Sequence, residues 1–107
     1  MTKVRIDPGI CGFTTIVTAE ADDDQDVKLR VASGCKAVQE MMKALGEDFD
    51  AYELCLVKPG KGPLFEYASE HFPIHVGCPV FSGIIKCVEA ECHLALPKDA
   101  AIHFEKA

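Results

Sequence analysis

Cysteine is the residue type with the most chemical potential in this chain. Six thiols occur among 107 residues, at positions 11, 35, 55, 78, 87 and 92. Thiolates bind soft metal ions and attack sulfur, so this number calls for metal ligation, sulfur chemistry or burial as its explanation. No apolar leader follows Met1. We therefore expect a cytoplasmic protein with reduced thiols, and not a disulfide framework.

Composition and charge restrict the class of protein and its partners. The chain is 49% hydrophobic and 26% charged, which is typical of a globular protein, and its length suits a single domain over residues 1–107. Acidic residues outnumber basic ones by 17 to 11, and Lys and Arg do not cluster. We therefore expect neither nucleic acid nor an anionic membrane as a partner. No apolar run is long enough to span a bilayer.

Alternating polarity predicts strands in the first third of the chain. Residues 3–6, 13–20 and 27–31 are rich in β-branched residues or alternate between polar and apolar ones. An acidic turn, Asp22–Asp26, separates the last two. The pattern predicts a first strand followed by a β-hairpin.

Helical spacing dominates the rest of the chain. It predicts helices over 35–45, 63–72 and 79–93, while 48–58 fits a helix or a strand and 72–77 reads as extended. Ile102 and Phe104 mark a short last strand. The fold class that follows is α+β, with an antiparallel sheet of three to four strands and helices packed on one face.

The predicted elements divide the cysteines into two groups. Cys11 precedes the hairpin and Cys35 follows it, and the midpoint between them falls at Asp23 in the turn, so the hairpin brings both thiols to one end of the sheet. Cys35 and Cys78 each follow a glycine at the start of a helix, where the helix dipole favours the thiolate. The remaining cysteines at 55, 87 and 92 lie on or beside apolar faces, and we expect them to be buried.

At these positions the sequence resembles a known family. Cys11-Gly12 before a hairpin, Gly34-Cys35 before one helix and Cys78 before another resemble the iron–sulfur cluster assembly scaffolds of the NifU N-terminal and IscU type. Residues 73–78 also align without a gap on that family's segment before its third cysteine. The resemblance implies a SufE/NifU-like fold that holds a [2Fe–2S] cluster or zinc through three converging thiolates. The partners we expect are a sulfur donor or apo iron–sulfur proteins, and the sequence leaves a homo-oligomer open.

Two positions near the thiols differ from that family. Phe13 stands where the family has Asp, and Gly77 stands where it has His. His75 lies two residues before Gly77, and residues two apart in an extended segment share a face, so His75 is a candidate fourth ligand. A neutral imidazole suits a site that already contains three thiolates.

Two other functions stay open at the level of sequence. Cys78-Pro79 at a helix start is similar to the Cys-Pro motif of TusA-like proteins, which predicts a thiol-based sulfur carrier or redox protein acting through Cys78. The other alternative is a small interaction domain without chemistry. The aspartates at 22, 24 and 26 lack the glycine and glutamate of a calcium loop, so we interpret them as a solvated turn.

Overall fold

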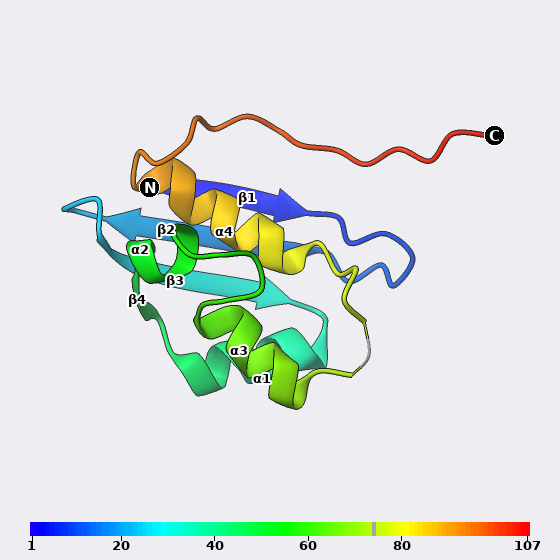
Figure 1. Ribbon diagram of the computed structural model, residues 1–107, viewed down its shortest axis with the longest axis horizontal. Coiled ribbons are helices and arrows are strands. Elements are labelled where there is room, and N and C mark those ends of the chain that lie inside the picture. Colours follow the sequence, from blue (N-terminus) through cyan, green and yellow to red (C-terminus); the bar gives the residue numbers. More distant parts are fainter. Residues whose placement is uncertain (74) are drawn as a thin grey trace.

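The computed structural model describes residues 1–73 and 75–107 and has an α+β architecture (Figure 1). Its elements follow in the order β1 (Thr2–Ile6), β2 (Thr15–Ala21), β3 (Asp26–Ser33), α1 (Lys36–Leu45), β4 (Asp48–Asp50), α2 (Ala51–Cys55), α3 (Pro63–His71) and α4 (Val80–Glu91). The four strands form one antiparallel sheet in sequence order, β1-β2-β3-β4. The predicted fold class is confirmed.

One face of the sheet holds the hydrophobic core. Along β2, Val17 and Ala19 are fully buried whereas Glu20 is exposed, which is the alternation expected of a strand with one covered face. Helix α4 lies across this face and packs on β1 and β2 (Figure 1). A Cβ atom at Gly83 would overlap the side chain of Ile6, so glycine at this position lets α4 approach β1 closely.

The stretch that fits both a helix and a strand in the sequence contains one of each. β4 is a three-residue strand that pairs with the start of β3, and α2 follows it directly. Asp50 makes the change of direction possible, because its side chain accepts a hydrogen bond of 2.8 Å from the N–H of Tyr52 in the first turn of α2. The N–H of Ala51 donates to the carbonyl of Gln25, which ties the junction to the hairpin turn.

The predicted last strand at Ile102 and Phe104 is wrong for the single chain. Residues 95–107 carry neither helix nor strand, and Figure 1 shows them running along the outside of the molecule. Ile102 is 87% exposed and Phe104 is 101% exposed. An isolated extended segment has no backbone partner, and a β-propensity pattern alone does not stabilise it.

The expected extended stretch 72–77 is formed only in part. Phe72 is extended and ends α3, but Val76 and Gly77 form a turn, and Ile74 lies outside the described residues. In the part of the chain that the structure describes, no helix is both long and apolar enough to cross a membrane.

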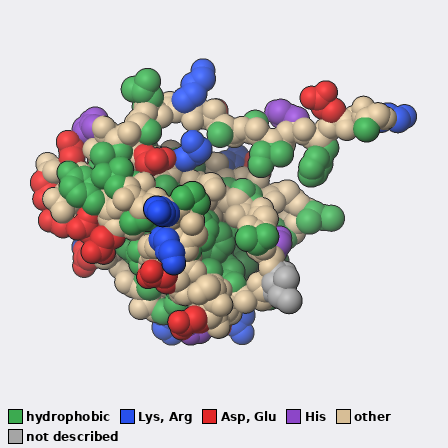
Figure 2. Space-filling model, viewed as in Figure 1, with side chains coloured by type: hydrophobic (Ala, Val, Ile, Leu, Met, Phe, Trp, Pro, Cys, Tyr) green, Lys and Arg blue, Asp and Glu red, His purple; other side chains and the backbone are tan. Residues whose placement is uncertain are grey.

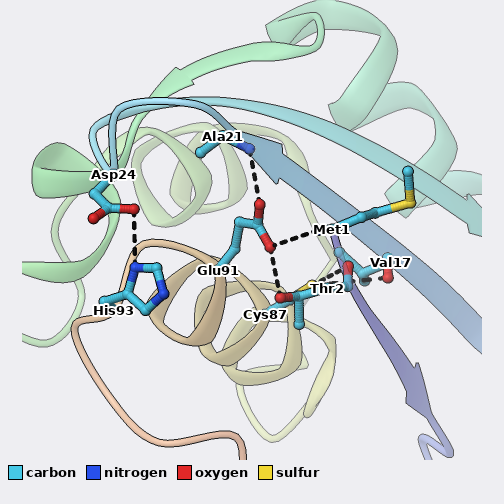
Figure 3. Close-up of polar contacts among 8 residues, drawn as sticks. All are labelled: Met1, Thr2, Val17, Ala21, Asp24, Cys87, Glu91 and His93. Carbon is cyan, nitrogen blue, oxygen red and sulfur yellow. Dashed lines mark hydrogen bonds and ion pairs between the residues drawn. The ribbon is translucent and has the colours of Figure 1, made fainter.

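A largely buried carboxylate closes the end of the molecule opposite to the predicted site. Glu91, at the end of α4, accepts hydrogen bonds from the Thr2 hydroxyl at 2.7 Å and the Ala21 N–H at 3.0 Å (Figure 3). The amino group of Met1 lies 3.4 Å from the same carboxylate. Glu91 therefore joins β1, β2 and α4 at one point.

Candidate functional site: the thiol end of the sheet

Three segments meet at one end of the sheet, and each carries one of the predicted ligands. The β1–β2 loop holds Cys11, the β3–α1 junction holds Cys35, and the α3–α4 loop holds Cys78. Figure 1 shows these three connections at the same side of the sheet. The strand register agrees, because Ile6 pairs with Thr15 and Thr15 pairs with Ser33. We call this region, residues 7–14, 33–35 and 75–79, the thiol end.

Cys35 is held in place by hydrogen bonds to a serine. Its N–H donates to the hydroxyl of Ser33 at 3.1 Å, and the buried Thr15 donates to the same hydroxyl at 2.8 Å. Cys35 is the residue immediately before α1 and is half-buried against the core. Sequence reasoning missed Ser33, although a serine two residues before the N-cap of a helix is a known local signal for such a turn.

Cys78 is positioned by aromatic packing between the two helices that flank its loop. Phe72 at the end of α3 and Phe65 within it each lie 5.2 Å, centroid to centroid, from Phe81 in the first turn of α4. These contacts fix both ends of the loop that carries Cys78. The thiol itself is half-buried and packs on the core.

Burial raises the pKa of the Cys78 thiol, which is the largest of the effects on it. The N–H of Val80 lowers that pKa, and negative charge on Cys35 and on Cys11 raises it. The prediction that the helix start favours the Cys78 thiolate is therefore wrong, because desolvation outweighs the helix N-terminus. The effect of both other thiols on Cys78 also shows that the three cysteines lie within electrostatic reach of one another.

Cys11 lies in an exposed loop that is fastened to the β3–α1 junction by an aromatic side chain. A Cβ atom at Gly34 would lie 3.0 Å from Cδ1 of Phe13, so the Phe13 ring rests on Gly34, directly before Cys35. On either side of Cys11, Gly9 and Gly12 have φ angles of 95° and 72°, in open space. Phe13, which stands where the scaffold family has Asp, thus links the Cys11 loop to the β3–α1 junction that carries Cys35.

The thiols of Cys11, Cys35 and Cys78 lie at one end of the sheet but are not arranged around a common metal position. Among residues 1–73 and 75–107, no group of three or more His, Cys, Asp or Glu side chains is arranged to hold a metal ion. His75 is exposed on the loop before Cys78. Two hollows in the surface lie elsewhere, one of about 290 Å³ beside β2, β3 and α1 and one of about 400 Å³ among acidic residues near the hairpin turn.

The other cysteines lie in or beside the core. Cys87 and Cys92 are buried as expected, whereas Cys55 is half-buried. Burial raises the pKa of Cys87 to about 11 and that of Cys55 to about 12. The Cys87 thiol donates to the carbonyl of Thr2 at 3.4 Å (Figure 3), so it acts as a small core residue that also binds the edge strand.

The fold and the thiol end together describe a small α+β domain with clustered cysteines. The chain belongs to the Family of unknown function (DUF6951), whose pattern matches residues 2–104. No curated protein and no solved structure matches the chain.

Proposed function

We propose that this domain binds zinc or a [2Fe–2S] cluster through Cys11, Cys35 and Cys78 and acts as a scaffold or carrier. His75 is the candidate fourth ligand. The observation that carries the proposal is the common position of the three cysteines at the thiol end, where charge on Cys11 and on Cys35 acts on Cys78. Negatively charged thiolates repel one another, and a bound cation relieves that repulsion.

The donor set fits the chemistry of the proposed group. Three thiolates carry three negative charges against the two positive charges of zinc or of an oxidised [2Fe–2S] unit, so a neutral imidazole is a suitable fourth ligand. A bound metal would hold the three thiols in the deprotonated state, which is the form that ligates.

The three thiols differ in how firmly the structure holds them. Cys35 and Cys78 are half-buried and held by the contacts of Ser33 and Phe72, whereas Cys11 is exposed between two glycines. We infer that metal binding draws the Cys11 loop toward the other two thiols.

The test is metal binding by a matched set of variants. The wild-type chain, purified anaerobically, is titrated with zinc against a chromophoric chelator and separately reconstituted with iron and sulfide. We expect binding of one zinc ion or one cluster. Cys11→Ser, Cys35→Ser and Cys78→Ser should each weaken zinc binding by more than about 100-fold. Losing a residue that only supports a ligand costs up to about 100-fold, and losing the ligand itself should cost more. His75→Ala should also weaken it while leaving the circular dichroism spectrum unchanged.

Cys55→Ser is the control, because Cys55 is a half-buried thiol in α2, outside the thiol end. Its zinc affinity should equal that of the wild type. Wild-type affinity in the variant that lacks all three thiol-end cysteines would overturn the proposal. Wild-type affinity in His75→Ala alone would remove His75 from the ligand set and leave solvent or a partner as the fourth ligand.

The two alternatives make different predictions for the same samples. A sulfur carrier or redox protein acting through Cys78 needs a reactive thiolate at neutral pH, and the raised pKa of Cys78 weighs against it. A domain without chemistry binds no zinc in any variant, and the lack of a preformed metal group among the described residues favours this alternative. The zinc titration of the wild type separates it from the metal site.

A further inference from the structure

The segment after α4 has the pattern of a strand but no strand to pair with. Ala100, Ile102 and Phe104 alternate with Asp99, Ala101, His103 and Glu105, so an extended chain would place the two large apolar residues on one face and the polar ones on the other. Ile102 and Phe104 are exposed, and no backbone hydrogen bond of the described chain involves residues 99–107.

At the other end of the sequence, β1 has a free edge. It is the outermost strand of the sheet, and among residues 1–73 and 75–107 it pairs with β2 alone. Its outer N–H and C=O groups are therefore available to a further strand. Val4 packs against the core but stays half-buried, as expected of an edge residue whose outer side is uncovered.

We propose that residues 99–105 of one copy add as a fifth strand to the β1 edge of a second copy, and that the exchange is reciprocal. This inference is independent of the proposed metal site.

The two faces of the segment match the two faces of β1. Thr2, Val4 and Ile6 face α4 and the core, whereas Lys3 and Arg5 face the open side of the sheet. Strand pairing in either direction that sets Ile102 and Phe104 beside Val4 places His103 and Glu105 on the side of Lys3 and Arg5. The apolar pair then covers the half-buried edge, and a carboxylate joins two cations in a chain whose net charge is −6.

Two observations favour a second copy as the occupant. The family match runs from residue 2, where β1 begins, to residue 104, so the exposed segment belongs to the family's domain. In the single chain, residues 95–107 are all exposed and stand off β1, although they start close to it (Figure 1). Figure 2 shows this segment standing away from the body with its side chains in solvent.

The test is sedimentation velocity of the full chain over a range of concentrations, with reductant present so that the exposed Cys11 does not cross-link. The wild type should form dimers at micromolar concentration. The double variant Ile102→Asp and Phe104→Asp should weaken dimerisation by at least roughly tenfold, because it places two charges in an apolar contact. Both positions are exposed in the monomer, so the variant should keep the wild-type circular dichroism spectrum.

Leu96→Asp is the matched control. Leu96 is an equally exposed apolar residue of the same segment, outside the alternating stretch, and its replacement should leave dimerisation unchanged. A wild type that stays monomeric up to about 100 μM, a concentration high enough to detect a weak interface, would overturn the proposal. A dimer that survives the double aspartate variant would also overturn it. A monomer whose β1 amide protection depends on Ile102 and Phe104 would overturn it too, because the segment would then pair within one chain.

Discussion

At the turn end of the sheet, residues 22–26, 48–52 and 91–93, carboxylates accept hydrogen bonds from backbone N–H groups, whereas the loops of the thiol end are held by hydroxyl groups and aromatic contacts. Asp23 accepts from the N–H groups of Gln25 and Asp26, and Asp50 accepts from that of Tyr52. His93 lies 2.9 Å from Asp24 (Figure 3). Figure 2 shows the acidic side chains gathered at the turn end.

This difference separates structural from adaptable polar groups. Asp23 and Asp50 form a turn and cap a helix, so these acidic residues have a structural role and do not indicate a ligand site. At the thiol end Cys11 is exposed and flanked by glycines, and burial, together with charge on Cys35 and on Cys11, raises the pKa of Cys78. The exposed loop between these glycines is the part that can change its shape around a ligand.

The largest expected difference between the two ends lies in thiol reactivity. Cys92, at the turn end, is 2% exposed, and burial and the nearby carboxylates raise its pKa. Cys11 is exposed. Alkylation of the metal-free chain, followed by mass spectrometry, should modify Cys11 on the order of a thousandfold faster than Cys92, whose reaction requires opening of the fold. Cys78 should react more slowly than Cys11. Equal rates at positions 11 and 92 would mean that the two ends are equally open.

The next largest effect concerns the stability supplied by the turn end. Glu91→Ala removes the acceptor of two hydrogen bonds from a side chain that is only 9% exposed. The unpaired Ala21 N–H should lower the free energy of unfolding by about 2–3 kcal/mol. Urea denaturation measures this change, and Cys11→Ala at the thiol end should stay within about 0.5 kcal/mol of the wild type. An equal loss in both variants would contradict the contrast between the ends.

The same carboxylate predicts a pH dependence. Burial alone would raise the pKa of Glu91, but the hydrogen bonds from Thr2 and Ala21 and the charge of the amino terminus together lower it below its ordinary value of 4.5. A group with a lowered pKa in the folded state stabilises the fold above its unfolded-state pKa and loses this effect as the pH falls through the folded value. Glu91→Gln should therefore make unfolding less sensitive to pH below about 4.5.

The smallest effect should come from the contact between the Cys11 loop and the Cys35 junction. Gly34→Ala places a Cβ atom 3.0 Å from Cδ1 of Phe13, whose half-exposed ring is free to move outward. We expect a loss of less than about 1 kcal/mol in unfolding free energy, together with faster proteolysis of the β1–β2 loop. A loss of more than about 2 kcal/mol would show that the thiol end is as rigid as the core.

The sequence predicted those parts of the molecule that depend on local pattern. The hairpin, the helices at 36–45 and 80–91 and the common location of Cys11 and Cys35 follow from alternation, helical spacing and the acidic turn. β4 has only three residues, too few for a period to be read, and it depends on pairing with β3. The pKa of Cys78 was predicted in the wrong direction because burial by helix packing cannot be seen in the loop's own sequence.

β4 also determines how the sheet can grow. It pairs with only three residues of β3 and passes directly into α2, and Asp48 and Asp50 flank its single buried residue, Phe49. A short, charged strand of this kind does not accept another strand. The sheet therefore has one edge that can be extended, the one at β1. A reciprocal exchange through that edge closes after two copies, because the segment and the β1 edge of each copy are then both occupied.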